Sequence, residues 1–496
     1  MKRKMRIMAI LVMLVAQTLL SGIYPFKAMA EETETTAATA QAASEIKENI
    51  LTGVVLKDEK GNVIHAGENP DLHPSLGSAV EISITWALKN NHGYKDGDHF
   101  SFNLPKEFAV YNDIDPQPLL FDGGTVGIFT VTKEGKVTMT FNGEIETHSN
   151  VNGTIKLWTE FSEQLVGSVT KEIVFPIKDE QVVEIPVTFQ PKPGPPIDKK
   201  GVPNKAYNAE SIDWTVDFNK QLAKVDQAIL KDPIQKGQAL QPGSIKLYHL
   251  DVQLDGSVKQ GDVVNPDEYT VEKTTDGGDF QIRFKADPIR SAYRLSFTTN
   301  ITDADQTSFV NEASLHGTNI DELKAKATVS VGRGTPLAKE STGYDAKTQT
   351  IDWTVKYNYN EKTIAKNNAV LTDYFTNTQE LVDGSFKVYQ ITLDANGAEK
   401  TEQLLPADQY TITPISKTGQ DGFEFKFNKD IHEAYKIVYQ TKAKDRVFDN
   451  GTITNNVESG TDKASASRNT SQGILTKTNK PEYPETNYYN KSTKWE

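Results

Sequence analysis

An internal repeat limits the possible folds of this chain more than any other feature. The pentapeptide Ile-Asp-Trp-Thr-Val occupies positions 212–216 and returns letter for letter at 351–355, 139 residues later. Two further pairs of segments agree at nearly the same offset, namely 243–248 with 384–389 and 292–295 with 434–437. A repeat period of about 140 residues has the size of a whole domain. The sequence therefore predicts two domains of the same fold in tandem.

Short segments of alternating hydrophobic and polar residues predict the secondary structure. The alternation is clear at 79–86, 136–141 and 280–284 and is typical of half-buried antiparallel strands. Pairs typical of hairpin turns recur at Asp96-Gly97, Asp122-Gly123, Asn142-Gly143, Asn152-Gly153, Asp276-Gly277 and Asn396-Gly397. We therefore expect an all-β chain of three tandem β-sandwich domains, with a possible truncated fourth. Segment 221–230 fits a short helix and a loop equally well.

The two ends of the chain differ in composition from its body. A basic start, an apolar stretch from Ile7 to Ile23 and the small residues around Ala28-Met29-Ala30 predict a signal peptide at 1–30. Residues 31–45 are rich in Thr, Ala and Glu and predict a flexible leader. Residues 475–496 fit either a tail or the start of a further repeat, and they carry no sorting signal for the cell wall.

Proline and glycine mark the boundaries between the expected domains. The stretch 191–196 contains four prolines, cannot join a sheet ladder and predicts a stiff spacer, while 332–336 is a shorter break. We expect a first sandwich at 46–190, a second at 191–331 and its repeat at 332–474.

Composition excludes several classes of function. The chain has 67 acidic and 54 basic residues, a net charge of −13 and a pI near 5.3, which argues against nucleic acid as a partner. It has no cysteine and eight scattered histidines, so we expect no metal and no cofactor. No pair of carboxylates stands out as a glycosidase would require, so the chain is not expected to be a turnover enzyme.

Three polar residues hold matching places in both repeats and suggest a covalent reaction. Burial of such a trio lowers the pKa of the lysine toward a nucleophilic amine and raises that of the aspartic acid. The amine can then attack the asparagine carbonyl, ammonia leaves, and a Lys-Asn isopeptide bond remains. The two candidate sets are Lys200, Asp232 and Asn311 in the first repeat, and Lys339, Asp373 and Asn455 in the second.

This ordered set, with its Trp-containing strand and the late Val-Asn-Glu-Ala at 310–313, resembles the isopeptide-crosslinked Ig-like domains of Gram-positive collagen-adhesin-like cell-wall surface proteins. The resemblance covers 191–470, and 46–190 more loosely. It implies that all three sandwiches are Ig-like, that 191–331 is a domain of the collagen-binding type and that 332–474 is its repeat. It implies crosslinks from Lys200 to Asn311 with Asp232, and from Lys339 to Asn455 with Asp373. Lys199 is the alternative to Lys200, because a shift of one residue exchanges the faces of a strand. The leading sandwich has no comparable trio, and we expect no crosslink there.

The resemblance also implies a ligand and a place for it. Family members can wrap a collagen triple helix between the first two sandwiches, with the Pro-rich linker spanning the gap. Segment 323–331 is then either a latch that closes this gap or the last strand of its own sandwich. The candidate groove residues are Thr215, Asp217, Tyr207, Tyr248 and Tyr293, although the face beside the repeated Trp offers acidic residues where a basic and aromatic mixture is expected.

We therefore expect a monomeric extracellular adhesin for a host matrix protein, most simply collagen, with no membrane insertion after signal removal. The protein is wall-anchored if a longer form carries an anchor, and otherwise secreted. The alternative is a structural stalk or pilus-like repeat subunit without its own ligand.

Overall fold

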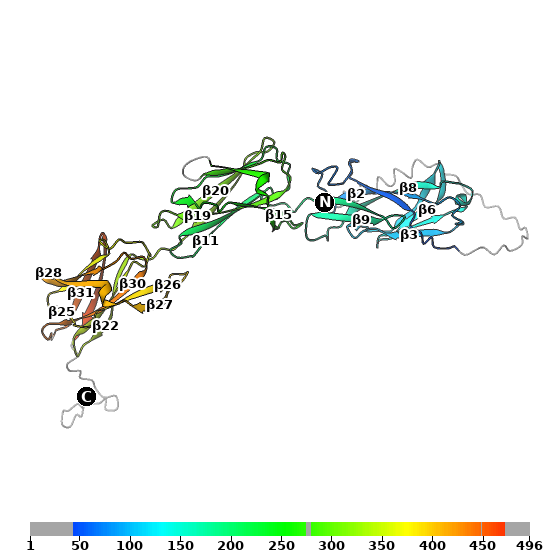
Figure 1. Cartoon of the computed structure of the whole chain (residues 1–496). Coiled ribbons are helices and arrows are strands. Elements are labelled where there is room, and N and C mark those ends of the chain that lie inside the picture. Colours follow the sequence, from blue (N-terminus) through cyan, green and yellow to red (C-terminus); the bar gives the residue numbers. More distant parts are fainter. Residues whose placement is uncertain (1–42, 274–278, 448, 472–496) are drawn as a thin grey trace, which may run out of the picture.

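The computed structural model describes residues 43–273, 279–447 and 449–471, which fold into β-strands and short 3-10 helices (Figure 1). Three sandwiches follow one another along the chain, and the all-β, Ig-like prediction is confirmed. Within the described ranges there is no helix of the length and apolarity needed to cross a membrane. The expected signal peptide, nearly all of the leader, the C-terminal tail and the turn at Asp276-Gly277 lie outside the described residues.

The first sandwich contains two four-stranded sheets, in the orders β1-β2-β8-β4 and β3-β7-β6-β5, and the separate hairpin β9–β10. Its elements are β1 (Leu51–Lys57), β2 (Ala79–Ala87), β3 (His99–Asn103), β4 (Phe108–Ala109), β5 (Ile114–Phe121), β6 (Gly124–Val131), β7 (Lys136–Phe141), η1 (Gly143–Glu146), β8 (Asn152–Phe161), β9 (Thr170–Pro176) and β10 (Val182–Thr188).

The second sandwich pairs the sheet β11-β12-β19-β15-β16, with β14 beside β19, and the sheet β17-β18-β13-β20-β21. Its elements are β11 (Ile197–Pro203), β12 (Ser211–Phe218), β13 (Ile229–Asp232), β14 (Gln238–Leu240), β15 (Lys246–Val252), β16 (Val258–Val263), η2 (Pro266–Glu268), β17 (Tyr269–Lys273), β18 (Phe280–Phe284), β19 (Ala292–Ile301), β20 (Ser308–His316) and β21 (Leu323–Ser330).

The third sandwich repeats this topology strand for strand, as β22-β23-β30-β26-β27 with β25 beside β30, and β28-β29-β24-β31-β32. Its elements are β22 (Leu337–Asp345), β23 (Thr350–Tyr357), β24 (Val370–Thr376), β25 (Gln379–Leu381), β26 (Lys387–Leu393), β27 (Glu399–Leu404), η3 (Ala407–Gln409), β28 (Tyr410–Lys417), β29 (Gln420–Phe427), β30 (Ala434–Ala443), β31 (Gly451–Ser459) and β32 (Asp462–Thr470).

Two of the predicted Asn-Gly turns are wrong. Asn142 caps the 3-10 helix η1, where its side chain accepts a hydrogen bond from the Glu144 amide, and Gly143 is the first residue of that helix. Asn152 and Gly153 belong to β8, where a Cβ at Gly153 would come within 2.9 Å of the Trp86 ring. Close packing explains this glycine, which therefore marks a strand. The open segment 221–230 is a loop that leads into β13.

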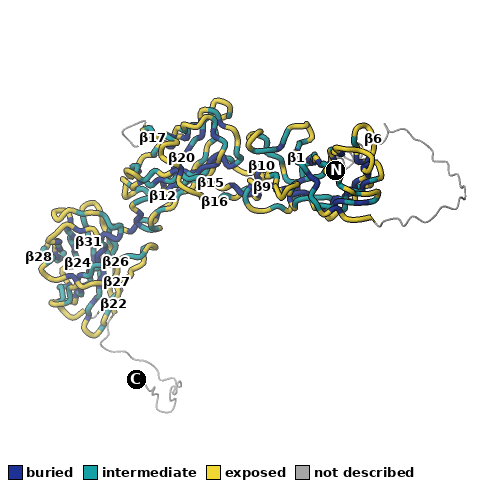
Figure 2. The backbone as a smooth tube through the Cα atoms, turned by 45° about the vertical axis from the view of Figure 1, so that its right-hand side comes forward, coloured by how far each residue is buried: buried dark blue, intermediate teal, exposed yellow. Residues whose placement is uncertain are grey.

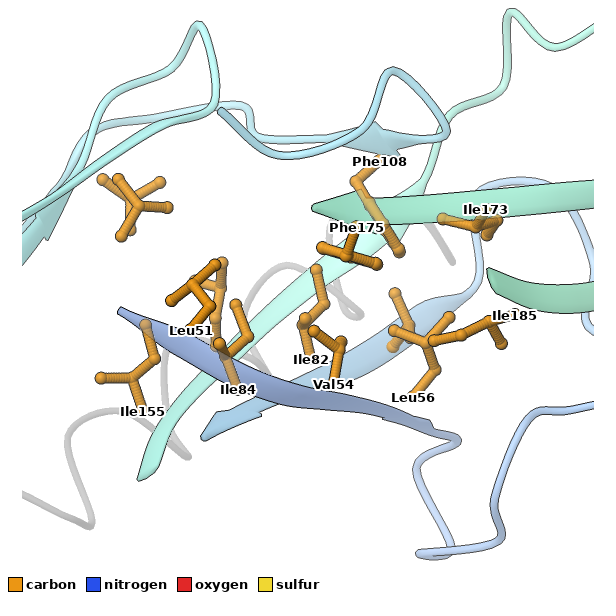
Figure 3. Close-up of a cluster of buried hydrophobic side chains, with 14 of the residues drawn as sticks. Leu51, Val54, Leu56, Ile82, Ile84, Phe108, Ile155, Ile173, Phe175 and Ile185 are labelled. Carbon is orange, nitrogen blue, oxygen red and sulfur yellow. The ribbon is translucent and has the colours of Figure 1, made fainter. Parts of the chain in front are cut away.

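Alternating side chains of facing sheets form the hydrophobic cores. Buried positions lie inside each sandwich, and exposed ones gather on loops and outer faces (Figure 2). In the first sandwich, side chains from the β1-β2-β8-β4 sheet point toward those of the β9–β10 hairpin, including Ile173, Phe175 and Ile185 (Figure 3). The hairpin thus closes one part of this core.

The first junction between sandwiches is largely apolar. The β15–β16 hairpin of the second sandwich reaches back, and Leu250, Val252 and Leu254 join the hydrophobic cluster of the first. The Leu254 amide donates to the Gly167 carbonyl at 2.8 Å, and the Val169 amide donates to the Val252 carbonyl at 3.0 Å. Main-chain bonds and apolar burial therefore hold these two sandwiches together.

The corresponding β26–β27 hairpin of the third sandwich reaches back to the second. The Tyr207 amide donates to the Ala395 carbonyl at 3.0 Å. Asn208, which is 3% exposed, donates to the Tyr359 carbonyl at 2.8 Å and accepts from the Gly334 amide at 3.0 Å. Both junctions therefore use the same hairpin of the repeat, although the second one is more polar.

We predict that Asn208→Ala loosens the second junction. The change leaves the Gly334 amide without its acceptor and costs about 1 to 3 kcal/mol, the typical cost of an unpaired buried polar group. Hydrogen exchange of the Gly334 amide should accelerate. Asn204→Ala is the matched control, because Asn204 accepts from Glu210 and Ser211 inside the second sandwich. Equal exchange at Gly334 in Asn208→Ala and wild type would contradict this role.

Candidate functional site

A lysine and an aspartic acid meet in the core of the second sandwich. Lys199 on β11 contacts Asp232 on β13, and both side chains are 0% exposed. Asn311 on β20 is also fully buried, and neither of its side-chain polar atoms makes a hydrogen bond of normal geometry. Asp232 and Asn311 lie on neighbouring strands of one sheet, while Lys199 comes from the opposite sheet.

The structure corrects the choice of lysine. Lys200, which equal spacing favours, is exposed on the outer face of β11, and the alternative Lys199 takes the inner position. Lys199 is the register partner of Val216, just as Lys339 is the partner of Val355.

Two differences in length between the repeats, which act in opposite directions, explain why equal spacing indicates Lys200. In the third sandwich β22 carries a bulge between Ser341 and Gly343, which adds one residue after the lysine. In the second sandwich the turn that connects β11 to β12 is two residues longer than the turn that connects β22 to β23 in the third. The difference is visible in the paired residues, since Val202 pairs with Asp213 whereas Gly343 pairs with Asp352. The net difference of one residue exchanges the two faces of the strand.

The third sandwich builds the same site as the sequence predicted it. Lys339 on β22 lies 2.6 Å from Asp373 on β24, and their side chains are 0% and 1% exposed. Asn455 on β31 is fully buried. Asp373 pairs with Val457 and Phe375 pairs with Asn455, so the acid and the amide are diagonal neighbours on one face. The structure thus brings together every predicted member of this trio.

Burial controls the charge of these groups. It raises the pKa of Asp232 to about 6 and lowers the pKa of Lys199, because apolar surroundings disfavour each charged form. Burial likewise raises the pKa of Asp373 and lowers that of Lys339. Each pair is therefore displaced toward a neutral amine beside a neutral acid, the state that suits a nucleophilic lysine.

Aromatic rings enclose both lysines. The Lys199 amine lies 5.5 Å from the Trp214 ring and 5.0 Å from the Phe297 ring. The Lys339 amine lies 5.5 Å from the ring of Trp353 and 4.9 Å from that of Tyr439. The repeated Trp is therefore a wall of each site.

Sequence reasoning missed the second aromatic residue and the threonine that fixes the Trp. Trp214 donates to Thr299 and Trp353 donates to Thr441, each at 2.9 Å. The repeated segments at 292–295 and 434–437 could have indicated both residues. Phe297 and Tyr439 follow these segments at the same distance, and so do Thr299 and Thr441.

The first sandwich lacks these components in its described part. Its buried polar residues are Asp98 and Glu107, with no lysine or asparagine among them. The absence of a crosslink there stays a prediction.

The candidate groove residues do not form one surface. Thr215 and Asp217 on β12 and Tyr248 on β15 share the outer face of the β11-β12-β19-β15-β16 sheet, where Asp217 and Tyr248 are both register partners of Arg294. Arg294 binds the Asp217 carboxylate through two nitrogens, at 2.6 and 2.8 Å. Neighbouring strands thus add the basic and aromatic side chains that the sequence of β12 alone lacks.

The other two candidates lie elsewhere. Tyr207 belongs to the junction with the third sandwich, where its ring lies against Gly397. Tyr293 is 7% exposed and packs between the rings of Phe218 and Phe284, with centroids 5.7 and 4.8 Å away. Neither faces the surface formed by Thr215, Asp217 and Tyr248.

Segment 323–331 forms the last strand of its own sandwich. Over Leu323–Ser330, β21 pairs with β20 along its length, including Ala327 opposite Asn311. In the part of the chain that the structure describes, no group of three or more His, Cys, Asp or Glu residues is placed to hold a metal ion.

Comparisons with known proteins address the same regions. The family model of the collagen binding domain matches residues 194–326 and again 338–470, together more than half of the chain, and a bacterial Ig domain model matches 75–172. No curated protein matched the sequence.

Among solved structures, the chain is similar to the collagen adhesin of S. aureus, with 17% identity over 58% of this chain and 95% of the other and a TM-score of 0.23. It is also similar to the Enterococcus faecalis protein ACE, described as binding its ligands by the collagen hug model, with 20% identity over 57% and 96% of the two chains and a TM-score of 0.22. The collagen binding domain of Erysipelothrix rhusiopathiae RspB matches with 17% identity over 58% and 99% and a TM-score of 0.21.

We predict that Asp232→Ala strands Lys199 in the core without its partner, at a cost of roughly 3 to 5 kcal/mol to the second sandwich. The double variant Lys199→Met/Asp232→Ala should be more stable than Asp232→Ala in urea unfolding, since it also removes the stranded amine. Both variants lack an intact trio, so their comparison is independent of any crosslink. Asp213→Ala, on the outer face, is the control. A double variant that is less stable than Asp232→Ala would contradict the account.

Proposed function

Because this chain belongs to the family of the collagen binding domain, we propose that it is an exported bacterial adhesin that binds host extracellular matrix, with collagen as its ligand. The observation that carries this proposal is the pair of family matches at 194–326 and 338–470. The expected signal peptide supports an extracellular location, and we infer no turnover activity.

We further propose that the second and third sandwiches are crosslinked, Lys199 to Asn311 and Lys339 to Asn455. The neutral amine attacks the side-chain carbon of the asparagine, the C–N bond to the amide nitrogen breaks, and ammonia leaves with the proton that the amine gives up. No oxidant or cofactor is required. Complete burial, the displaced pKa values and the repetition of the trio in both sandwiches support this reaction.

Unpaired oxygens support a role for the aspartic acid. In each site, Oδ1 of the aspartic acid and Oδ1 of the asparagine make no hydrogen bond. A proton on Oδ1 of the aspartic acid would give each of these two oxygens a hydrogen-bond partner, since the acid O–H can donate to the amide carbonyl. This bond would polarise the carbonyl for attack and stabilise the oxyanion that develops.

The crosslinks would strengthen the sandwiches as mechanical units. Each joins the first strand of one sheet to a late strand of the other and closes a loop of more than a hundred residues, which is worth on the order of 4 to 5 kcal/mol in chain entropy. An adhesin without cysteine gains in this way the covalent constraint that a disulfide gives other exported domains.

For the ligand we propose the outer face that Thr215, Asp217, Tyr248 and Arg294 form. This face adjoins the first junction, because Leu250 on the same strand as Tyr248 already packs against the first sandwich. A collagen chain bound here would contact both sandwiches. The Asp217–Arg294 pair can exchange hydrogen bonds with backbone amides, and Tyr248 offers an aromatic surface to imino acids.

The crosslinks predict the intact mass of the purified protein. We expect the mature chain to be lighter than its sequence by the mass of two ammonia molecules. Lys199→Ala should restore one of them, whereas Lys200→Ala should restore none. A wild-type mass equal to that of the full sequence would exclude both crosslinks, and a restored ammonia in Lys200→Ala alone would exclude the assignment of Lys199.

Collagen binding can be tested with the full mature chain on immobilised native collagen, with heat-denatured collagen and fibrinogen as controls. We expect saturable binding to the native form and a loss of about tenfold in affinity for Tyr248→Ala, the usual effect of removing an aromatic anchor. Tyr389→Ala is the matched control, because Tyr389 holds the same register position in the third sandwich.

Two outcomes would contradict the binding proposal. Equal affinities of Tyr248→Ala and Tyr389→Ala for native collagen would show that the ligand does not bind to the outer face of the second sandwich. Absence of binding to native collagen would favour the stalk alternative, which the hydrogen-bonded second junction also suits.

A further inference from the structure

The two sites differ in the aromatic residue beside the lysine. Trp214 pairs across the sheet with Phe297, and its counterpart Trp353 pairs with Tyr439. The aromatic wall beside the lysine therefore carries a hydroxyl group in the third sandwich and none in the second.

The Tyr439 hydroxyl is the centre of the third site. It accepts from the Lys339 amine at 2.5 Å and from the Asn455 amide nitrogen at 2.8 Å, and it donates to Oδ2 of Asp373 at 2.7 Å. Tyr439 is fully buried, as are its partners, so these bonds have no competition from bulk water. One oxygen atom thus touches both the nitrogen that would attack and the nitrogen that would leave.

The second site has no such connection. Lys199 still contacts Asp232, but neither polar atom of the Asn311 side chain makes a hydrogen bond of normal geometry. The amide of Asn311 therefore lies beside Asp232 without a hydroxyl to orient it, whereas the amide of Asn455 is oriented by a hydroxyl.

We propose that Tyr439 is a catalytic residue that carries a proton from the attacking lysine nitrogen to the departing amide nitrogen. This inference rests on the crosslink proposed above for Lys339 and Asn455, and it assigns to the third sandwich a proton path that the second lacks.

The step balances in atoms and charge. The Lys339 nitrogen forms a bond to the side-chain carbon of Asn455 and becomes positive. It passes one proton to the Tyr439 oxygen, which passes its own proton to the amide nitrogen, either directly or through Oδ2 of Asp373. The C–N bond then breaks, ammonia departs, and Tyr439 is again a neutral phenol.

The surroundings keep the phenol neutral between these transfers. Burial is the main cause that raises the pKa of Tyr439 well above its ordinary value, and the neighbouring Asp373 adds to it. A phenolate would be costly here, so the hydroxyl acts by exchanging one proton for another. A positioned acid or base group of this kind commonly contributes about a hundredfold or more in rate.

The test follows both crosslinks in one chain. The full chain is made by cell-free translation, synthesis is stopped, and samples are quenched in acid at increasing times and digested. Mass spectrometry then measures the branched peptide from Lys339 and Asn455 against the one from Lys199 and Asn311. In wild type we expect the third sandwich to complete its link first.

Two reciprocal variants test the hydroxyl itself. Tyr439→Phe should slow the Lys339–Asn455 link by about a hundredfold and leave the Lys199–Asn311 link unchanged. Phe297→Tyr should accelerate the latter about tenfold or more, because it supplies the missing hydroxyl beside Asn311. A purely structural role for Tyr439 does not predict this gain. Circular dichroism of each variant checks that the sandwiches have folded.

The outcomes separate this inference from the proposal on which it rests. If wild type forms neither branched peptide, the crosslinks themselves are excluded. If wild type forms both, and Tyr439→Phe forms its link as early as wild type, the crosslinks stand and the role of Tyr439 is overturned.

Discussion

Two lysine side chains, Lys199 and Lys339, lie entirely inside apolar sandwiches, and the organisation of each core follows from this constraint. An unpaired ammonium in such a place costs several kcal/mol, so each lysine needs an acidic partner within contact distance. The partners come from the facing sheet, and aromatic rings occupy the remaining sides. A buried pair of this type stabilises a fold poorly by itself. Its presence in both repeats is therefore better explained by chemistry than by stability.

The repeat is also a unit of assembly. In both the second and the third sandwich, the hairpin that lies beside the central strand of the first sheet reaches back to the preceding sandwich. Leu250 and Val252 bury apolar surface at the first junction, whereas Asn208 organises hydrogen bonds at the second. The outer face with Tyr248 and Arg294 continues from the first of these junctions. The proposed ligand face and the connection between sandwiches thus share one hairpin.

The sequence predicts the fold class and most of the site. The repeated pentapeptide, strand alternation and matched spacing led to the tandem sandwiches and to five of the six proposed crosslink residues. Equal spacing favours Lys200 over Lys199, because a bulge at Ser341 and a longer hairpin after Val202 change the spacing by one residue. Lys199 and Lys339 nevertheless keep equivalent strand partners. Spacing along the chain cannot reveal such compensating differences.

The other residues whose positions the sequence does not predict share one physical explanation. The sequence suggests that Tyr207 and Tyr293 lie on a surface. In the structure Tyr207 lies in the second junction, and Tyr293 packs in the aromatic core of the second sandwich. The sequence does not indicate Arg294, because this residue lies 77 positions from Asp217 and reaches it from another strand. Tyr439 likewise meets its partners only in the folded core. Which side chains gather across a sheet depends on register, and positions along the chain do not reveal which residues of distant strands become partners.

The central claim is that each buried lysine is bonded to its asparagine. The most direct measurement is a high-resolution crystal structure of the wild-type mature chain. The account predicts continuous electron density from the Lys199 nitrogen to the side-chain carbon of Asn311, and from Lys339 to Asn455, with each carbonyl accepting from its aspartic acid. Separate side chains, an ammonium in contact with a carboxylate and an intact carboxamide beside them, would contradict it.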